Sequence, residues 1–74
     1  MSARIGRKDL EAAERRVNSM LRKIQLKVSS RYNYTAIDIT DKRGIMIGTL
    51  VTGLSKRQAY DILEAIAEVL MREG

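Results

Sequence analysis

The sequence predicts an α+β domain: a helix, then an antiparallel β-hairpin or three-stranded sheet, then a second helix. Near both ends of the chain, apolar residues recur every three or four positions, which is typical of amphipathic helices. Between these segments lie stretches rich in β-branched residues, separated by turn sequences. The chain has 74 residues, so it forms one domain at most. We expect both helices to cover one face of the sheet, because two layers bury the apolar side of each element.

The first predicted helix begins at Lys8. It follows residues 1–7, which we expect to be a basic flexible tail outside a single domain of residues 8–74. The apolar stripe of this helix comprises Leu10, Ala13, Val17, Met20, Leu21 and Ile24. Roughly opposite the stripe, the cations form two ridges on a helical wheel, one with Lys8, Arg15 and Arg22 and one with Arg16 and Lys23. These cations should face solvent or a partner.

The segment after this helix has two interpretations. Residues 23–29, KIQLKVS, alternate apolar and polar side chains with the period of a strand. A helix continued through residue 28 would place Leu26 on the charged face. We prefer the strand, so the helix ends near Arg22 and the element order is αβββα. A helix unbroken to Ser30 would give αββα instead.

A hairpin is predicted over residues 34–40, YTAIDIT, and residues 45–52, IMIGTLVT. The linking sequence DKRG suits a type I turn with the glycine at positive φ. With Thr40 opposite Ile45, one face carries Ile37, Ile39, Met46 and Leu50, and the other carries Tyr34, Ile45, Ile47 and Val51. Helices cover only one of these partly apolar faces, so we expect a homodimer.

The last helix is predicted from about Lys56 to Arg72. Ser55 and Gln58 have the spacing of a capping box before it. Its buried side comprises Ala59, Ile62, Leu63, Ile66, Ala67, Val69 and Leu70, and its outer side carries Asp61, Glu64 and Glu68. A carboxylate trio on one helix face can in principle hold Mg²⁺. We prefer a solvated acidic face and expect no metal site.

The composition argues against catalysis. The chain contains no histidine and no cysteine, so it lacks the usual base near neutral pH and any thiolate nucleophile. We therefore expect a protein that is not an enzyme and needs no cofactor. No apolar run approaches the roughly 20 residues of a membrane span, and no apolar stretch follows the basic N-terminus as in a secretory signal. We expect a cytoplasmic protein with no membrane partner.

The positive charge is unevenly distributed. The net charge is +5, and residues 1–31 alone carry nine cations and three anions. A positive surface attracts nucleic acid or an acidic partner. Lys56 and Arg57 lie at a helix N-terminus, where unpaired N–H groups favour phosphate. Cations are unfavourable for the helix at that position, which hints at a functional reason for them.

The stretch GLSKRQAY, residues 53–60, resembles the start of the last helix of a double-stranded RNA-binding domain. That family has a glycine-containing loop followed by Ser-Lys-Lys-x-Ala-Lys, which Ser55, Lys56, Arg57 and Ala59 match. The resemblance implies that Lys56 and Arg57 grip phosphates across a major groove while the first helix lies along a minor groove. Tyr60 stands in place of the third cation. The stretch SSRYNY lacks the family's Gly-Pro and histidine, although Arg31 could reach a phosphate there.

Two functional hypotheses follow from these observations. The first is a small basic protein that binds RNA or DNA, most simply a duplex, through its phosphates. Its candidate binding residues are Lys8, Arg15, Arg16, Arg22, Lys23, Arg31, Lys56 and Arg57. The second is a dimeric protein–protein interaction or inhibitor module of the phage or mobile-element type, a possibility based on size and composition.

Overall fold

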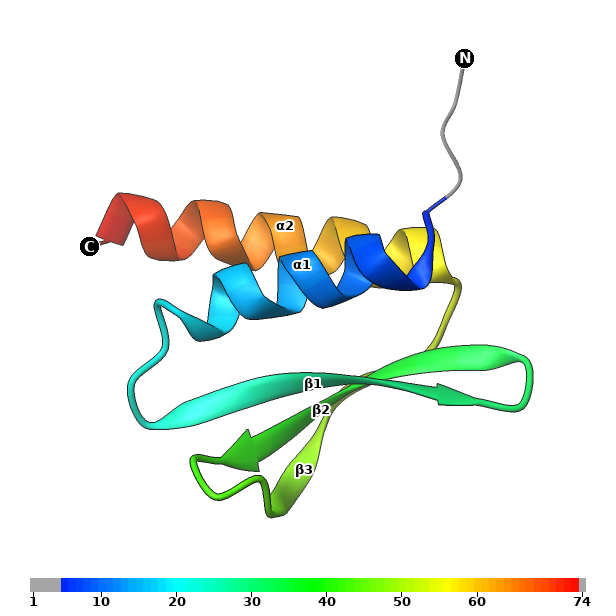
Figure 1. Cartoon of the computed structure of the whole chain (residues 1–74), viewed down its shortest axis with the longest axis horizontal. Helices are drawn as coiled ribbons and strands as arrows, with labels where there is room; N and C mark the ends of the chain where they lie inside the picture. The colour runs from blue at the N-terminus through cyan, green and yellow to red at the C-terminus, as the bar shows by residue number, and fades with distance from the viewer. Residues whose placement is uncertain (1–4, 74) are drawn as a thin grey trace.

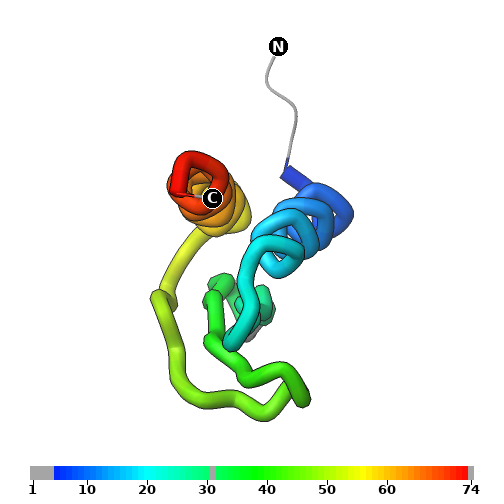
Figure 2. The backbone as a smooth tube through the Cα atoms, turned by 90° about the vertical axis from the view of Figure 1, so that its left-hand side faces the viewer, coloured from blue at the N-terminus to red at the C-terminus, as the bar shows by residue number. Residues whose placement is uncertain are grey.

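The computed structural model describes residues 5–73, apart from the side chain of Arg31, and has the predicted order helix, three strands, helix. The elements are α1 (Arg7–Asn18), β1 (Ile24–Arg31), β2 (Tyr34–Asp41), β3 (Met46–Leu54) and α2 (Lys56–Glu73). Both helices lie on one face of the sheet and run roughly parallel to each other (Figure 1). Viewed end-on, the helices form one layer and the strongly twisted sheet forms the other (Figure 2). The α+β class and the αβββα order are thus confirmed.

Helix α1 starts earlier and ends earlier than the sequence predicts. Gly6 is its N-cap, and the backbone N–H of Gly6 donates to the Asp9 carboxylate at 2.9 Å. Ile5 packs against the core, so residues 5–7 belong to the folded part of the chain. Residues 1–4 of the expected tail lie outside the described residues.

The early end of α1 breaks the predicted cationic ridges. The last helical residue is Asn18, whose side-chain amide donates to the Leu26 carbonyl at 2.9 Å and accepts from the Leu26 N–H at 2.8 Å. These two bonds tie the helix end to β1, an interaction that helical periodicity alone does not reveal. Arg22 and Lys23 therefore lie in the connection to β1, not on the helix.

The sheet is antiparallel with the strand order β1-β2-β3. Pairing of β1 with β2 is regular from Ile24 opposite Asp41 to Arg31 opposite Tyr34. Pairing of β2 with β3 contains three register shifts, and Thr40 faces Met46 where the sequence suggested Ile45. Each shift inserts an extra residue on β3, so the strand loses its period of two.

The register shifts overturn the predicted faces of the hairpin. Val51, which was expected on the face opposite Ile37, pairs with Ile37 and packs with Leu54 against the core, whereas Leu50 is exposed. The opposite face of the sheet has a polar centre, where buried Asp38 accepts hydrogen bonds from the hydroxyls of Ser29 at 2.8 Å and Thr49 at 3.2 Å. Ile45 and Ile47, which were expected on this face, and Met46, which was expected on the face of Ile37, are all exposed at or just before the start of β3.

The core lies between the two layers. Its buried residues are Leu10, Ala13, Val17, Leu26, Ile37, Ala59, Leu63 and Ala67. Ile62 and Ile66 are half-buried, whereas Val69, which the helical pattern placed on the buried side, is 61% exposed. The contact surface of α2 is therefore narrower than its apolar surface.

Helix α1 also protects the free edge of β1. The backbone N–H of Val28 donates to the Glu14 carboxylate at 2.7 Å, next to the paired bonds between Asn18 and Leu26. An unprotected edge strand offers such groups to strands of other chains. On β1 the side chains of α1 bind both backbone groups of Leu26 and the N–H of Val28, and on β3 the register shifts distort the pairing with β2.

Candidate phosphate-binding site

A groove of about 590 Å³ lies where the start of α1, the second half of β1 and the start of α2 meet. These segments lie at the same end of the molecule (Figure 1). The groove is lined by Arg7, Leu10, Glu11, Glu14, Lys27, Val28, Ser30 and Lys56. Three elements that are distant in sequence thus each bring one cation to a single concave surface.

Ser55 and Gln58 cap the start of α2 on either side of Lys56, the α2 residue that lines the groove. The backbone N–H of Gln58 donates to Ser55 Oγ at 3.1 Å, and the backbone N–H of Ser55 donates to Gln58 Oε1 at 2.9 Å. This reciprocal pair confirms the predicted capping box. The two bonds explain Ser55 as a helix cap without any contact to a ligand. They also hold the backbone on both sides of Lys56, whose side chain lines the groove.

The capping role predicts a separation of stability from binding. Ser55→Ala removes the Oγ acceptor and should lower the free energy of unfolding by about 1 kcal/mol. The affinity of the folded protein for a phosphate ligand should stay within about twofold, because the charge of the groove is unchanged. Urea unfolding and a binding titration on the same sample measure both quantities. A large loss of affinity without a loss of stability would show that the hydroxyl itself contacts the ligand.

The cations of the groove differ in their partners. Arg7 Nε lies 3.4 Å from the Glu11 carboxylate, and Glu14 accepts the N–H of Val28. Within the described part of the chain, no carboxylate forms an ion pair with Lys27 or Lys56. Lys27 and Lys56 are therefore the cations of the groove whose charge is open to a bound anion, and the start of α2 adds its positive dipole end.

The structure separates the eight cations that the sequence singled out. Lys56 lines the groove, and Lys8 is exposed in the first turn of α1 beside Arg7. Arg57 follows Lys56 but lies 3.5 Å from the Asp61 carboxylate. Arg15 is exposed in the last turn of α1, away from the groove lining, and the side chain of Arg31 lies outside the described residues.

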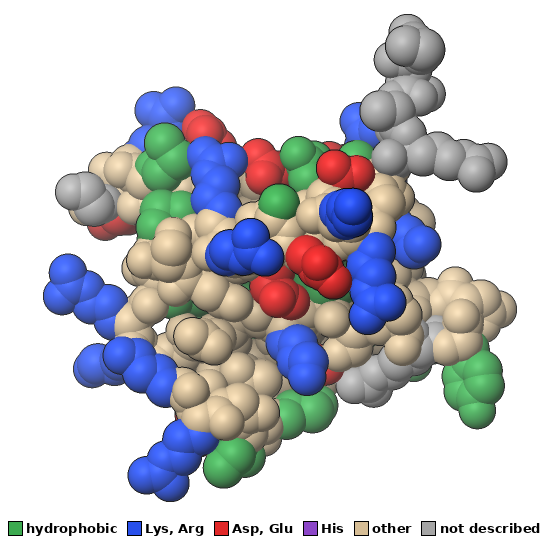
Figure 3. All heavy atoms as spheres, viewed as in Figure 1, with side chains coloured by type: hydrophobic (Ala, Val, Ile, Leu, Met, Phe, Trp, Pro, Cys, Tyr) green, Lys and Arg blue, Asp and Glu red, His purple; other side chains and the backbone are tan. Residues whose placement is uncertain are grey.

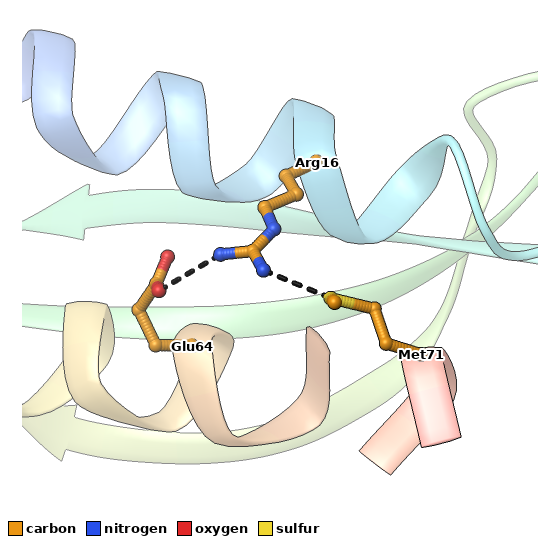
Figure 4. Close-up of polar contacts among 3 residues, drawn as sticks. All are labelled: Arg16, Glu64 and Met71. Carbon is orange, nitrogen blue, oxygen red and sulfur yellow. Dashed lines mark hydrogen bonds and ion pairs between the residues drawn. The ribbon is translucent and has the colours of Figure 1, made fainter. Parts of the chain in front are cut away.

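Arg16 is exposed, but its side chain lies against α2, which packs beside α1. One guanidinium nitrogen of Arg16 donates to Glu64 Oε1 at 3.0 Å and the other to Met71 Sδ at 3.0 Å (Figure 4). Its charge is therefore committed to holding the two helices together. The single-helix wheel could not anticipate this contact.

Arg22 and Lys23 lie at the other end of the molecule. The connection between α1 and β1 and the turn between β2 and β3 are both at the end opposite the start of α2 (Figure 1). Because Ile24 pairs with Asp41, Lys23, which precedes β1, lies at the same end of the sheet as Lys42 and Arg43, which follow β2. These four cations form a second basic region, separate from the groove, and we call it the hairpin-end cluster.

Arg7 and Lys27 are groove residues that the sequence interpretation missed. Arg7 fell within the expected tail, although Gly6 followed three residues later by Asp9 is a recognisable helix start. Lys27 was only one polar position in an alternating strand. No local signal shows that the edge strand β1 lies beside the start of α2.

The acidic residues of α2 do not converge on one point. Asp61, Glu64 and Glu68 each lie near a different arginine, Arg57, Arg16 and Arg72, at 3.5, 3.0 and 3.6 Å. Among the described residues, no group of three acidic side chains has the arrangement of a metal site. The trio that was considered for Mg²⁺ is thus distributed over three ion pairs.

The fold and the groove define a small basic αβββα domain with a cation-lined surface. Lys and Arg side chains are spread over the visible face, and Asp and Glu side chains lie near its centre and along its upper part (Figure 3). No family model matches the chain, and no characterised protein or solved structure is significantly similar to it. Within residues 5–73, neither helix has the length and apolar character needed to cross a membrane.

Proposed function

We propose that the protein is a non-catalytic nucleic-acid-binding protein that contacts the phosphates of a duplex through the groove around Arg7, Lys27 and Lys56. The observation that carries the proposal is the convergence of these cations from α1, β1 and α2 on one surface. If these cations served only to keep the surface soluble, they would have no reason to converge on one groove.

The chemistry of the groove fits a phosphodiester. Lys27 and Lys56 supply ammonium donors without carboxylate partners in the described chain, and Ser30 adds a hydroxyl. The N-terminus of α2 contributes backbone N–H groups and a partial positive charge. The carboxylates of Glu11 and Glu14 oppose an anion, but each already lies against a donor of this chain. We therefore expect moderate affinity.

The resemblance of residues 53–60 to a double-stranded RNA-binding domain supports the same role for Lys56. In that family the matching lysine contacts phosphates, and both the helices and the strands follow the order seen here. Tyr60 in place of the third cation reduces the expected number of phosphate contacts. Phosphate contacts alone carry no sequence information, so we expect little sequence preference.

The test is a salt-dependent binding titration. Fluorescence anisotropy is measured with labelled duplex RNA, duplex DNA and single strands. With three phosphate contacts, the affinity for a duplex should fall roughly 40-fold between about 50 mM and about 200 mM salt. Absence of binding at the lowest salt, or binding that is independent of salt, would contradict the proposal. A single stoichiometric protein partner captured from nuclease-treated lysate would then favour the interaction-module hypothesis.

A further inference from the structure

Helix α2 has an apolar flank that the core does not use. At about 100° per residue, Ile62, Ala65, Ile66 and Val69 fall on one side of the helix. Ile62 and Ile66 are half-buried, Ala65 is exposed and Val69 is 61% exposed. Glu64 and Tyr60 lie on the opposite side, toward α1, where Glu64 meets Arg16. We call the side that carries the four apolar residues the α2 flank.

The surroundings of the α2 flank leave it accessible. Figure 2 shows α1 on one side of α2 and β3 descending on the other side. The flank therefore faces away from α1 and borders β3, whose Leu50 is itself exposed. Nothing in the described chain covers Ala65 or Val69.

Other surfaces are poorly suited to a second copy of this chain. The edge of β1 is occupied by Asn18 and Glu14, and the register shifts distort the edge of β3. The exposed residues Ile45, Met46 and Ile47 lie near the hairpin-end cluster, so a symmetric contact there would bring eight cations together. Like charges brought together in this way oppose association.

The charges beside the α2 flank are self-complementary. Asp61 lies toward the start of α2 and Arg72 toward its end, both on the same rim of the flank by helical angle. Each also forms an exposed ion pair within its own helix, Asp61 with Arg57 and Arg72 with Glu68. If two α2 helices pack antiparallel about a two-fold axis, Asp61 of each copy approaches Arg72 of the other. Ile62 of each copy then approaches Val69 of the other, and Ala65 and Ile66 lie next to the axis. A symmetric dimer requires a face of this kind, because the same patch serves both subunits.

We propose that the α2 flank binds a second copy of this chain, with the two α2 helices antiparallel across a two-fold axis near Ala65 and Ile66. The helix has 18 residues and is about 27 Å long. Each partner buries roughly 800 Å² in a standard interface, so a stable dimer requires the bordering strand β3 to contribute beside the helix. The groove lies on the α1 and β1 side of α2, so it stays open in this dimer.

Cysteine cross-linking tests the position of the axis, because the chain has no natural cysteine. Ala65→Cys should form a disulfide-linked dimer under mild oxidation. Ala12→Cys provides the matched control, because Ala12 is also an exposed helical alanine but lies on α1, in the shallow groove between the two helices. Equal cross-linking of the two variants would overturn the proposal.

Light scattering behind a sizing column tests the dimer without any modification. The wild-type protein should show twice its chain mass of 8.4 kDa. Val69→Glu should be monomeric, whereas Met71→Glu, which changes a residue that is 53% exposed but contacts Arg16, should remain dimeric. A monomeric wild type at every concentration from about 1 µM to about 1 mM would refute the proposal.

A charge exchange tests the antiparallel orientation. Arg72→Asp places two acidic residues together in each symmetric contact and should raise the dissociation constant of the dimer about tenfold. Adding Asp61→Arg to that variant restores opposite charges and should recover most of the affinity. A double variant no tighter than Arg72→Asp alone would contradict the orientation. All these measurements are made without nucleic acid, so their outcome is independent of the proposed binding function.

Discussion

Replacing Lys27 and Lys56 together by glutamate is expected to abolish duplex binding at physiological salt while the protein stays folded. The two side chains come from β1 and α2, line the same groove and form no ion pair in the described chain. Charge-assisted contacts are worth about 1.5–3 kcal/mol each, so losing two of them should weaken binding by about 100-fold or more. Anisotropy with the preferred duplex measures the loss.

A matched control separates the groove from net charge. Arg22→Glu/Lys23→Glu makes the same change in charge at the opposite end of the molecule, within the hairpin-end cluster. At physiological ionic strength the Debye length is about 8 Å, so charges at that distance are largely screened. We expect this variant to lose less than about tenfold in affinity. Equal losses in the two double variants would indicate a diffuse effect of charge and exclude the groove as the site.

Both double variants must also remain folded for this comparison to hold. The four side chains are exposed, and exposed substitutions usually change the free energy of unfolding by less than about 0.5 kcal/mol. Thermal unfolding of each variant checks the assumption. If any binding is left to measure, the slope of log affinity against log salt should also become shallower in the groove variant. The change should correspond to the loss of about two phosphate contacts.

The element order could be predicted from the sequence because it depends on local pattern. The alternation in residues 23–29 identified β1, and the spacing of Ser55 and Gln58 identified the start of α2. The end of α1 could not be predicted, because it depends on hydrogen bonds between Asn18 and a residue of β1. The register of β3 was equally inaccessible, since its three shifts change which residues face the helices.

The candidate site was only partly predictable for the same reason. Lys56 was found because a helix N-terminus is visible in a short stretch of sequence. Arg7 and Lys27 join it through the packing of α1 and β1 at the start of α2, and no periodicity encodes that packing. Arg16 illustrates the opposite error, because a cation that is outward on an isolated helix points to α2 in the folded chain.

Leu63→Ala and Val69→Ala should have very different effects on stability, although the helical pattern of α2 predicts that both residues are buried. Leu63 is fully buried in the core, so truncation should cost about 2–5 kcal/mol through lost contacts and a cavity. A domain of this length is stabilised by roughly 4–11 kcal/mol in total, so much of the Leu63→Ala population should unfold on mild heating.

Val69→Ala removes a side chain that is 61% exposed, so the stability of the single chain should change by less than about 0.5 kcal/mol. Urea unfolding measures both variants at a protein concentration low enough to keep the chains monomeric. At higher concentration, Val69→Ala should lose the extra stability that association gives the wild type. A large loss for Val69→Ala in the monomer would mean that Val69 belongs to the core, and the α2 flank would then have no free apolar centre for a second copy.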